Sequence, residues 1–254
     1  MELKNSYYWF KEAISPENCQ KIIDLGLKTI ADEEAAGRSC TAVTMGRQEK
    51  DSKPNSMPQG ELSKYEISES GVENVDTYVR DSKVAWLKEQ WIYDLVMPWV
   101  ADANKRAGWN WQLETAEHFQ FTVYNPSGFY SWHKDGGSDN PARYKRYIYG
   151  VSDYEPVDGN IMPMGYTTDH HMVGKVRKIS TTINLNVPGD YDGGNLKFDF
   201  GMHTDKSARF HECEEIRPQG SLIVFPSFLP HCVTPVTRGT RYSLVLWSLG
   251  DPFK

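Results

Sequence analysis

The sequence has few cysteines, and they do not cluster. Cys19, Cys40, Cys213 and Cys232 are the only four in 254 residues, and no CxxC spacing occurs among them. A zinc knuckle or a disulfide framework requires such clustering, so neither is indicated. We therefore expect four free thiols and predict a cytoplasmic protein.

Long apolar runs and an excess of positive charge are missing as well. Residues 1–6 contain no apolar signal core, and no stretch approaches the ~20 apolar residues that span a bilayer. The 28 Lys and Arg residues are outnumbered by 34 Asp and Glu, which gives a net charge of −6. Binding to nucleic acid or to an anionic membrane surface usually depends on a basic patch, so we predict neither partner.

Aromatic residues, in contrast, are abundant. They make up 13% of the chain, with 8 Trp and 14 Tyr, a composition typical of strand-rich folds with aromatic-lined cavities. The length would allow two domains, but all-β proteins of this size often form one. We predict a single domain over 1–254, in which 1–113 is mainly helical support and 114–250 forms the β core.

Helical signals are concentrated in the first part of the chain. Ser15 and Pro16 suit the cap and first turn of a helix, and apolar residues follow at helical spacing as far as Ile30. The same spacing returns between Ile92 and Ala103, where Pro98 requires a kink or a restart. The polar stretch 47–74 between these helices is predicted to be a long surface connection.

From residue 114 onward the apolar pattern changes to a period of two. Apolar and polar residues alternate over 119–124 and again over 179–187, while 222–225 and 241–247 are shorter apolar strand candidates. These strands, preceded by helices, predict a mainly β fold, an antiparallel sandwich or jelly roll with supporting α-helices. The polar faces of otherwise apolar strands suggest a cavity between the sheets.

Two HxD triplets could contribute metal ligands. In His133-Lys134-Asp135, residues i and i+2 of a strand would project from the same face. Chance alone gives about half an HxD in a chain of this composition, and His203-Thr204-Asp205 fits a solvated loop equally well. A site of two His and one carboxylate for non-haem Fe(II) needs a second, distant His. His231 is that candidate, although a buried or loop histidine would be the default interpretation.

Arg241 opens the last apolar strand candidate. A guanidinium within such a strand is costly to desolvate unless it meets an anion, and its planar fork suits a carboxylate. A salt bridge to one of the chain's own acids is the alternative.

These residues occur in an order that resembles a known family. The matching positions are Tyr124, Gly128, Tyr130, His133 and Asp135, then the strand 180–185, the turn Tyr191-Asp192-Gly193-Gly194-Asn195-Leu196, the stretch His231 to Arg241 and finally Trp247. Together they resemble the Fe(II)/2-oxoglutarate-dependent oxygenases, and within them the prolyl 4-hydroxylase-like group that includes the PKHD-type hydroxylases. The resemblance covers about 114–250 and implies a double-stranded β-helix.

The resemblance also implies roles for individual residues. His133, Asp135 and His231 would hold Fe(II), and Arg241 would pair with the distal carboxylate of 2-oxoglutarate, to which Tyr124 also donates. Positions at the metal would remain open for 2-oxoglutarate and O₂, and ascorbate is a further cofactor of such enzymes. Thr182, Asn184 and Trp247 are predicted to line the same cavity, with ordinary sheet-face residues as the alternative.

The activity implied is hydroxylation of a substrate C–H bond, with 2-oxoglutarate converted to succinate and CO₂. A proline in a peptide or protein is the predicted target. Another amino-acid residue or a small molecule is the alternative within the enzyme class. Outside that class, the alternative is a non-catalytic, metal-holding jelly-roll binding module. The sequence does not identify an oligomeric state.

Residues 136–178 form an unusually long insertion between the metal-binding motifs. They include five tyrosines and many Gly, Pro and Asp residues, and segments of this length are usually functional or disordered. We predict a lid over the iron, longer than the loop expected in the family. Its basic cluster at 143–146 would meet an acidic substrate or form a solvated face, and Asp169-His170-His171 is interpreted as a surface loop.

Overall fold

The computed structural model describes residues 3–42, 80–137, 143–148, 152, 165–201 and 209–253. The predicted surface connection at 47–74 and the triplet His203-Thr204-Asp205 lie outside these residues.

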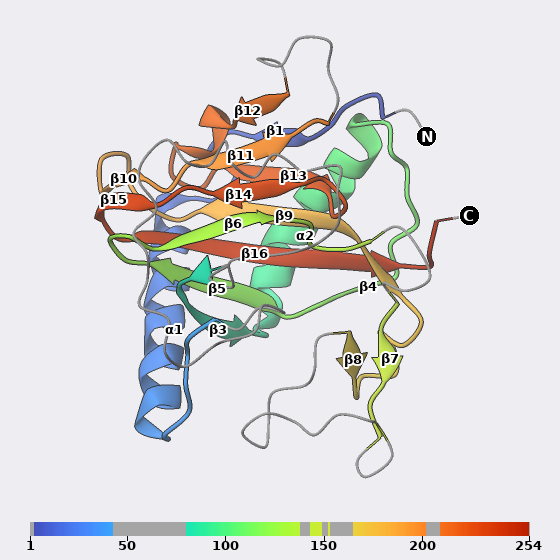
Figure 1. Cartoon of the computed structure of the whole chain (residues 1–254), viewed down its shortest axis with the longest axis horizontal. Helices are drawn as coiled ribbons and strands as arrows, with labels where there is room; N and C mark the ends of the chain where they lie inside the picture. The colour runs from blue at the N-terminus through green and yellow to red at the C-terminus, as the bar shows by residue number, and fades with distance from the viewer. Residues whose placement is uncertain are drawn as a thin grey trace, which may run out of the picture.

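Two sheets face each other across the interior (Figure 1). The larger has seven strands in the order β1-β13-β9-β16-β5-β3, with β4 paired to the end of β16. Its strands are β1 (Tyr8–Phe10), β3 (Lys83–Leu87), β4 (Thr115–Ala116), β5 (Phe119–Tyr124), β9 (Val176–Asn184), β13 (Leu222–Pro226) and β16 (Arg241–Gly250). All pairings in this sheet are antiparallel, as predicted.

The second sheet has five strands in the order β12-β11-β14-β6-β2. They are β2 (Arg80–Asp81), β6 (Phe129–His133), β11 (Leu196–Asp199), β12 (Phe210–Glu212) and β14 (His231–Val233). Two small pairs, β10 (Tyr191–Gly193) with β15 (Val236–Gly239) and β7 (Lys145–Arg146) with β8 (Tyr166–Thr167), and the 3-10 turn η4 (Glu214–Ile216) complete the elements described.

Helices α1 (Pro16–Ala35) and α2 (Gln90–Arg106) cover the outer face of the larger sheet (Figure 1). The Ser15 side chain accepts a hydrogen bond from the Asn18 backbone N–H, which confirms the predicted cap. The restart considered at Pro98 does not occur, because α2 runs through that residue as one helix. Packing of its apolar face against the sheet outweighs the one backbone hydrogen bond that proline cannot donate.

The alternation in β5 sorts side chains between two environments. Phe119 and Phe121 belong to the apolar cluster under the helices. Gln120 and Tyr124 point the other way and line a cavity between the sheets. The predicted cavity is therefore present, and its polar residues come from the inner face of the larger sheet.

The structure differs from some of the expected element boundaries. The predicted strand 179–187 begins earlier and ends earlier, since β9 covers Val176–Asn184. The first 113 residues are not only helical, because β1, β2 and β3 add strands to both sheets. All four cysteines are buried and free, as expected. Among the described helices, none has the length and apolar character needed to cross a membrane.

Candidate active site

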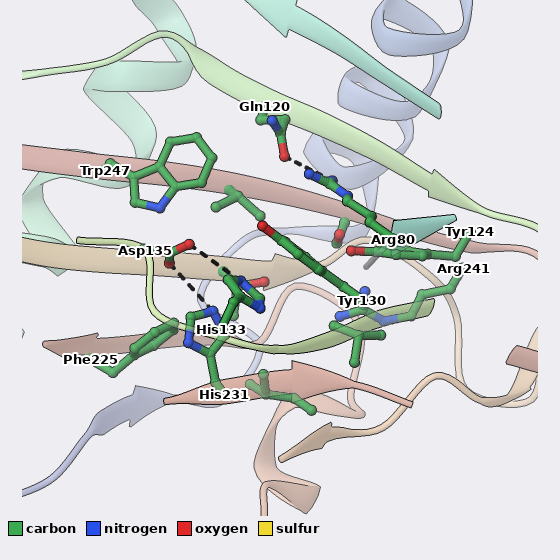
Figure 2. Close-up of a pocket in the computed structure, with 15 residues that line it drawn as sticks. Arg80, Gln120, Tyr124, Tyr130, His133, Asp135, Phe225, His231, Arg241 and Trp247 are labelled. Carbon is green, nitrogen blue, oxygen red and sulfur yellow. Dashed lines mark hydrogen bonds and ion pairs between the residues drawn. The ribbon is translucent and has the colours of Figure 1, made fainter. Parts of the chain in front are cut away.

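Three side chains with metal-ligating atoms meet on the inner face of the smaller sheet (Figure 2). His133 ends β6 and lies opposite His231, the first residue of the neighbouring strand β14. Asp135 follows in a bend, two residues beyond His133. Its Oδ1 lies 3.5 Å from His133 Nε2 and its Oδ2 lies 3.4 Å from His231 Nε2. The structure thus brings together the three predicted ligands.

Backbone carbonyls determine which nitrogen of each imidazole faces the cluster. His133 Nδ1 lies 2.7 Å from the Ser131 carbonyl oxygen, and His231 Nδ1 lies 2.9 Å from that of Leu229. A carbonyl only accepts hydrogen bonds, so each Nδ1 carries the proton and donates it. In the neutral rings, both Nε2 atoms therefore present lone pairs toward Asp135.

Burial and neighbouring groups shift the pKa values of His231 and Asp135 in this cluster. Burial and the neighbouring His133 lower the pKa of His231 to about 4, so its ring is neutral at neutral pH. Burial alone would raise the pKa of Asp135, but His231, His133 and Arg177 together hold it below its usual range. The metal-ligating atoms of the two imidazoles and the carboxylate lie within 4.8 Å of one another. This N/N/O set is the one that non-haem Fe(II) takes.

Arg241 lies in the same cavity and starts β16 directly opposite Tyr124 of β5. Its side chain is buried, with the residue only 1% exposed, and its guanidinium is 5.3 Å from the centre of the Tyr124 ring. Among the described residues, its Nε finds no hydrogen-bond partner and no carboxylate forms an ion pair with it. The salt-bridge alternative is therefore not seen there. A buried cation of this kind suits an anionic ligand that enters the cavity.

The other predicted site residues divide into two groups. Thr182 and Trp247 line the cavity, and the buried indole Nε1 of Trp247 has no partner among the described residues. Asn184 does not line it. Its side-chain amide donates to the carbonyl oxygens of Asn186 and Arg217 and accepts from Tyr191, so it ties loops together at the end of β9.

Tyr130, Arg80 and Gln120 line the cavity, although the sequence interpretation gave them no role at the site. The Tyr130 ring stacks on His133 with ring centres 3.5 Å apart, and the Arg80 guanidinium covers its other side at 4.6 Å. Arg80 also donates to Gln120 Oε1 at 2.9 Å. The alternation in β5 places Gln120 on the polar face and the family motif contains Tyr130, so the sequence could have indicated both as site residues. Arg80 follows a long polar stretch, and nothing in the sequence indicated it.

The metal-ligating atoms of Asp169, His170 and His171 also lie within 4.8 Å of one another. All three residues are exposed, in agreement with the predicted surface loop, and they occupy a turn rather than a strand.

A sequence model described as the 2OG-Fe(II) oxygenase superfamily matches residues 119–249, a little over half of the chain. The chain belongs to this superfamily. Its members use Fe(II), 2-oxoglutarate and O₂. The matched region contains the histidine pair, Asp135 and Arg241, so the superfamily's metal and cosubstrate chemistry fits the donors found in the cavity.

Individual relatives and solved structures are similar to the chain to different extents. A PKHD-type hydroxylase of Xylella fastidiosa (strain M23) is 35% identical over 107 residues, which cover 42% of this chain and 43% of that protein. The match thus spans less than half of the relative. The viral collagen prolyl hydroxylase of Paramecium Bursaria Chlorella virus-1, solved with 2-oxoglutarate, aligns over 97% of both chains with a TM-score of 0.53 and 14% identity.

A Trichoplax adhaerens prolyl hydroxylase, solved with a peptide fragment of the hypoxia inducible factor oxygen degradation domain, gives a TM-score of 0.52 at 15% identity. It aligns over 96% of this chain and 83% of that one. At these identities the likeness concerns the fold. The fold of the chain is the double-stranded β-helix of the prolyl hydroxylases, as the family resemblance implied.

Proposed function

We propose that the chain is an Fe(II)- and 2-oxoglutarate-dependent hydroxylase. The observation that supports this most strongly is that one cavity contains two functional groups. They are a His-Asp-His ligand set and a buried arginine without a carboxylate partner among the described residues. A non-catalytic binding module would have no use for a second, anion-binding group beside its metal. Fe(II), when bound, would supply oxidative decarboxylation of 2-oxoglutarate to succinate and CO₂, coupled to hydroxylation of the substrate.

In this proposal the protein's own residues bind and orient the reactants. His133, Asp135 and His231 would hold the metal within the cavity that they line. Arg241 neutralises the distal carboxylate of 2-oxoglutarate, and the Tyr124 hydroxyl donates to it. Both lie on neighbouring strands of the larger sheet, so the cosubstrate would bridge the two sheets.

For the substrate, we propose a proline in a peptide or protein. Structural neighbours support this, since they are prolyl hydroxylases and one was solved with a peptide. Trp247 and Tyr130 also line the cavity and give it aromatic surface, a kind that the apolar C–H groups of a pyrrolidine ring pack against. Hydroxylation of another residue or of a small molecule is the alternative within the same mechanism.

Succinate release tests the oxygenase proposal. Purified protein with Fe(II), 2-oxoglutarate and O₂ should form succinate, and His133→Ala and Asp135→Ala should each abolish it. His203→Ala, from the other HxD triplet, is the matched control and should retain turnover. If the His203 variant lost the metal while the His133 variant kept full activity, the metal site would be at the other HxD triplet and our assignment would be wrong. Metal binding without succinate release under any substrate would favour the binding module.

The substrate proposal needs a separate experiment. Proline-containing peptides incubated with the active enzyme should gain the mass of one oxygen atom, and replacing the proline by alanine should prevent the gain. Oxygen addition at another residue, or to a small molecule only, would replace the prolyl assignment and leave the oxygenase assignment intact.

A further inference from the structure

Asp135 lies outside the strand that carries the first histidine ligand. β6 ends at His133, so the ladder of the smaller sheet does not hold Asp135. Support comes instead from β9 of the opposite sheet. There the Ser180 hydroxyl donates to Asp135 Oδ2 at 2.7 Å, and the Arg177 guanidinium donates to the Asp135 carbonyl oxygen at 3.2 Å. The orientation of this carboxylate therefore depends on contacts across the cavity.

The direction of the hydrogen bond at Ser180 follows from its partners. Ser180 is the donor in its contact with Asp135, so its single hydroxyl hydrogen points to Oδ2. Ser180 Oγ also lies 3.0 Å from Ser227 Oγ, and in that contact Ser227 must then be the donor. Both serines are fully buried, so no solvent competes for these bonds. The relay runs in one direction, from Ser227 through Ser180 to Asp135.

The two oxygens of Asp135 are consequently unequal. Oδ2 accepts a short hydrogen bond, which withdraws part of its charge and occupies one of its lone pairs. Oδ1 lies 3.5 Å from His133 Nε2, and among the described residues no hydroxyl donates to it as Ser180 does to Oδ2. The side chain cannot rotate to offer both oxygens equally without breaking the bond to Ser180.

We propose that Ser180 is a positioning residue for the metal site: by holding Oδ2, it presents Oδ1 as the single ligand atom of Asp135 and keeps the remaining metal positions open. The inference rests on the proposed metal site. Outer hydrogen bonds of this kind commonly change metal affinity by about 10–100-fold when removed. A serine that only satisfied a buried polar neighbour would leave the metal's geometry unchanged.

Co(II) substitution tests this without turnover, because the visible absorption of Co(II) reports its coordination number. Wild-type protein, Ser180→Ala, Ser180→Thr and Ser248→Ala are titrated with Co(II) in the absence of 2-oxoglutarate. Ser248 is the matched control, since it is equally buried, lies on β16 and has no hydrogen-bond partner among the described residues. Unfolding midpoints of the four proteins establish that each is folded.

Ser180→Ala should bind Co(II) at least tenfold more weakly, with weaker visible bands as Asp135 becomes free to chelate through both oxygens. Ser180→Thr, which keeps the hydroxyl, should restore much of the wild-type spectrum, and Ser248→Ala should match wild type. Ser227→Ala should also weaken Co(II) binding and the visible bands, but to a smaller extent. If Ser180→Ala does not fold, Ser227→Ala replaces it in the test. Wild-type affinity and spectrum in Ser180→Ala would overturn the positioning role.

A different result would refute the proposed metal site itself. Should Co(II) binding to the wild-type protein be insensitive to His133→Ala, the site itself is wrong and the inference about Ser180 falls with it. Retained His133 dependence with no effect at Ser180 refutes only the inference.

Discussion

Arg241 is a buried guanidinium opposite Tyr124, in a cavity that also contains the proposed metal ligands. Arg241→Lys keeps the charge but loses the two parallel donors that hold a carboxylate. We expect the KM for 2-oxoglutarate to rise by at least tenfold, with Fe(II) affinity nearly unchanged. Succinate formation at varied 2-oxoglutarate measures this.

Arg238→Lys is the control for that experiment, because Arg238 lies three residues earlier and forms an exposed ion pair with Asp192. Its KM should equal that of wild type. Unaltered cosubstrate kinetics in Arg241→Lys would give Arg241 a purely structural role and weaken the oxygenase proposal.

His231 links the metal-free site to acid stability. Its folded pKa of about 4 lies below the ordinary value of 6.5, because it is buried beside His133. Between pH 6.5 and 4, His231 is therefore protonated in the unfolded chain but not in the folded chain. The free energy of unfolding decreases as pH falls through this range. The full effect is on the order of 3 kcal/mol.

Urea unfolding of the metal-free protein between pH 7 and pH 4.5 tests this prediction. His231→Gln should flatten the pH dependence of the unfolding free energy relative to wild type, whereas His118→Gln, at an exposed position, should not. Identical pH profiles for wild type and His231→Gln would show that His231 titrates normally in the folded protein.

At the scale of elements, Gly26 determines how closely α1 approaches the larger sheet. A Cβ at this position would lie 2.3 Å from the Phe121 ring on β5. Gly26→Ala gains about 1 kcal/mol of helix propensity, but overpacking of a dense core typically costs 1–3 kcal/mol. Because this overlap is severe, we expect a net loss of about 1–2 kcal/mol of unfolding free energy.

A double-mutant cycle measures the contact. In a Phe121→Leu background, where the ring is absent, Gly26→Ala should cost less or even stabilise the protein. Equal costs in both backgrounds would mean that α1 does not pack on Phe121 in this way.

At the scale of the whole molecule, the 136–178 insertion connects the surface to the metal site. Tyr144 donates to Glu117 at 2.7 Å, and Glu117 accepts two hydrogen bonds from Arg177, which in turn contacts Asp135. Arg177 also lies over the Trp247 ring at 3.9 Å. The ends of the insertion are thus part of the support of the site. Residues 149–151 and 153–164 lie outside the described residues, and a lid over 136–178 stays a proposal.

Replacing residues 149–164 by a short Gly/Ser linker tests that proposal, because it keeps Tyr144 and Arg177. We expect Fe(II) and 2-oxoglutarate binding to be retained and substrate hydroxylation to fall, with succinate formed without product. The ratio of succinate to hydroxylated substrate measures the uncoupling. An unchanged ratio and rate would mean that the middle of the insertion is not a lid.

Local sequence determined much of the architecture and most of the proposed site. The cap at Ser15, the alternation in β5 and the motifs around His133, His231 and Arg241 each act over a few residues, where side-chain period and chemistry are readable in the chain. These signals predicted the helices, the inner polar face and an antiparallel sandwich or jelly roll. The family resemblance of the motifs added the double-stranded β-helix and the three residues that meet as a metal-ligand set.

Contacts between distant segments were decided only by the tertiary structure. Arg80 covers Tyr130 because β2 pairs with β6, and Ser180 reaches Asp135 because the two sheets face each other across the cavity. Asn184 shares the inner-face pattern of Thr182, yet loop backbones at the end of β9 engage its amide. Periodicity gives the face of a strand, but the partner on that face depends on how segments far apart in sequence pack together.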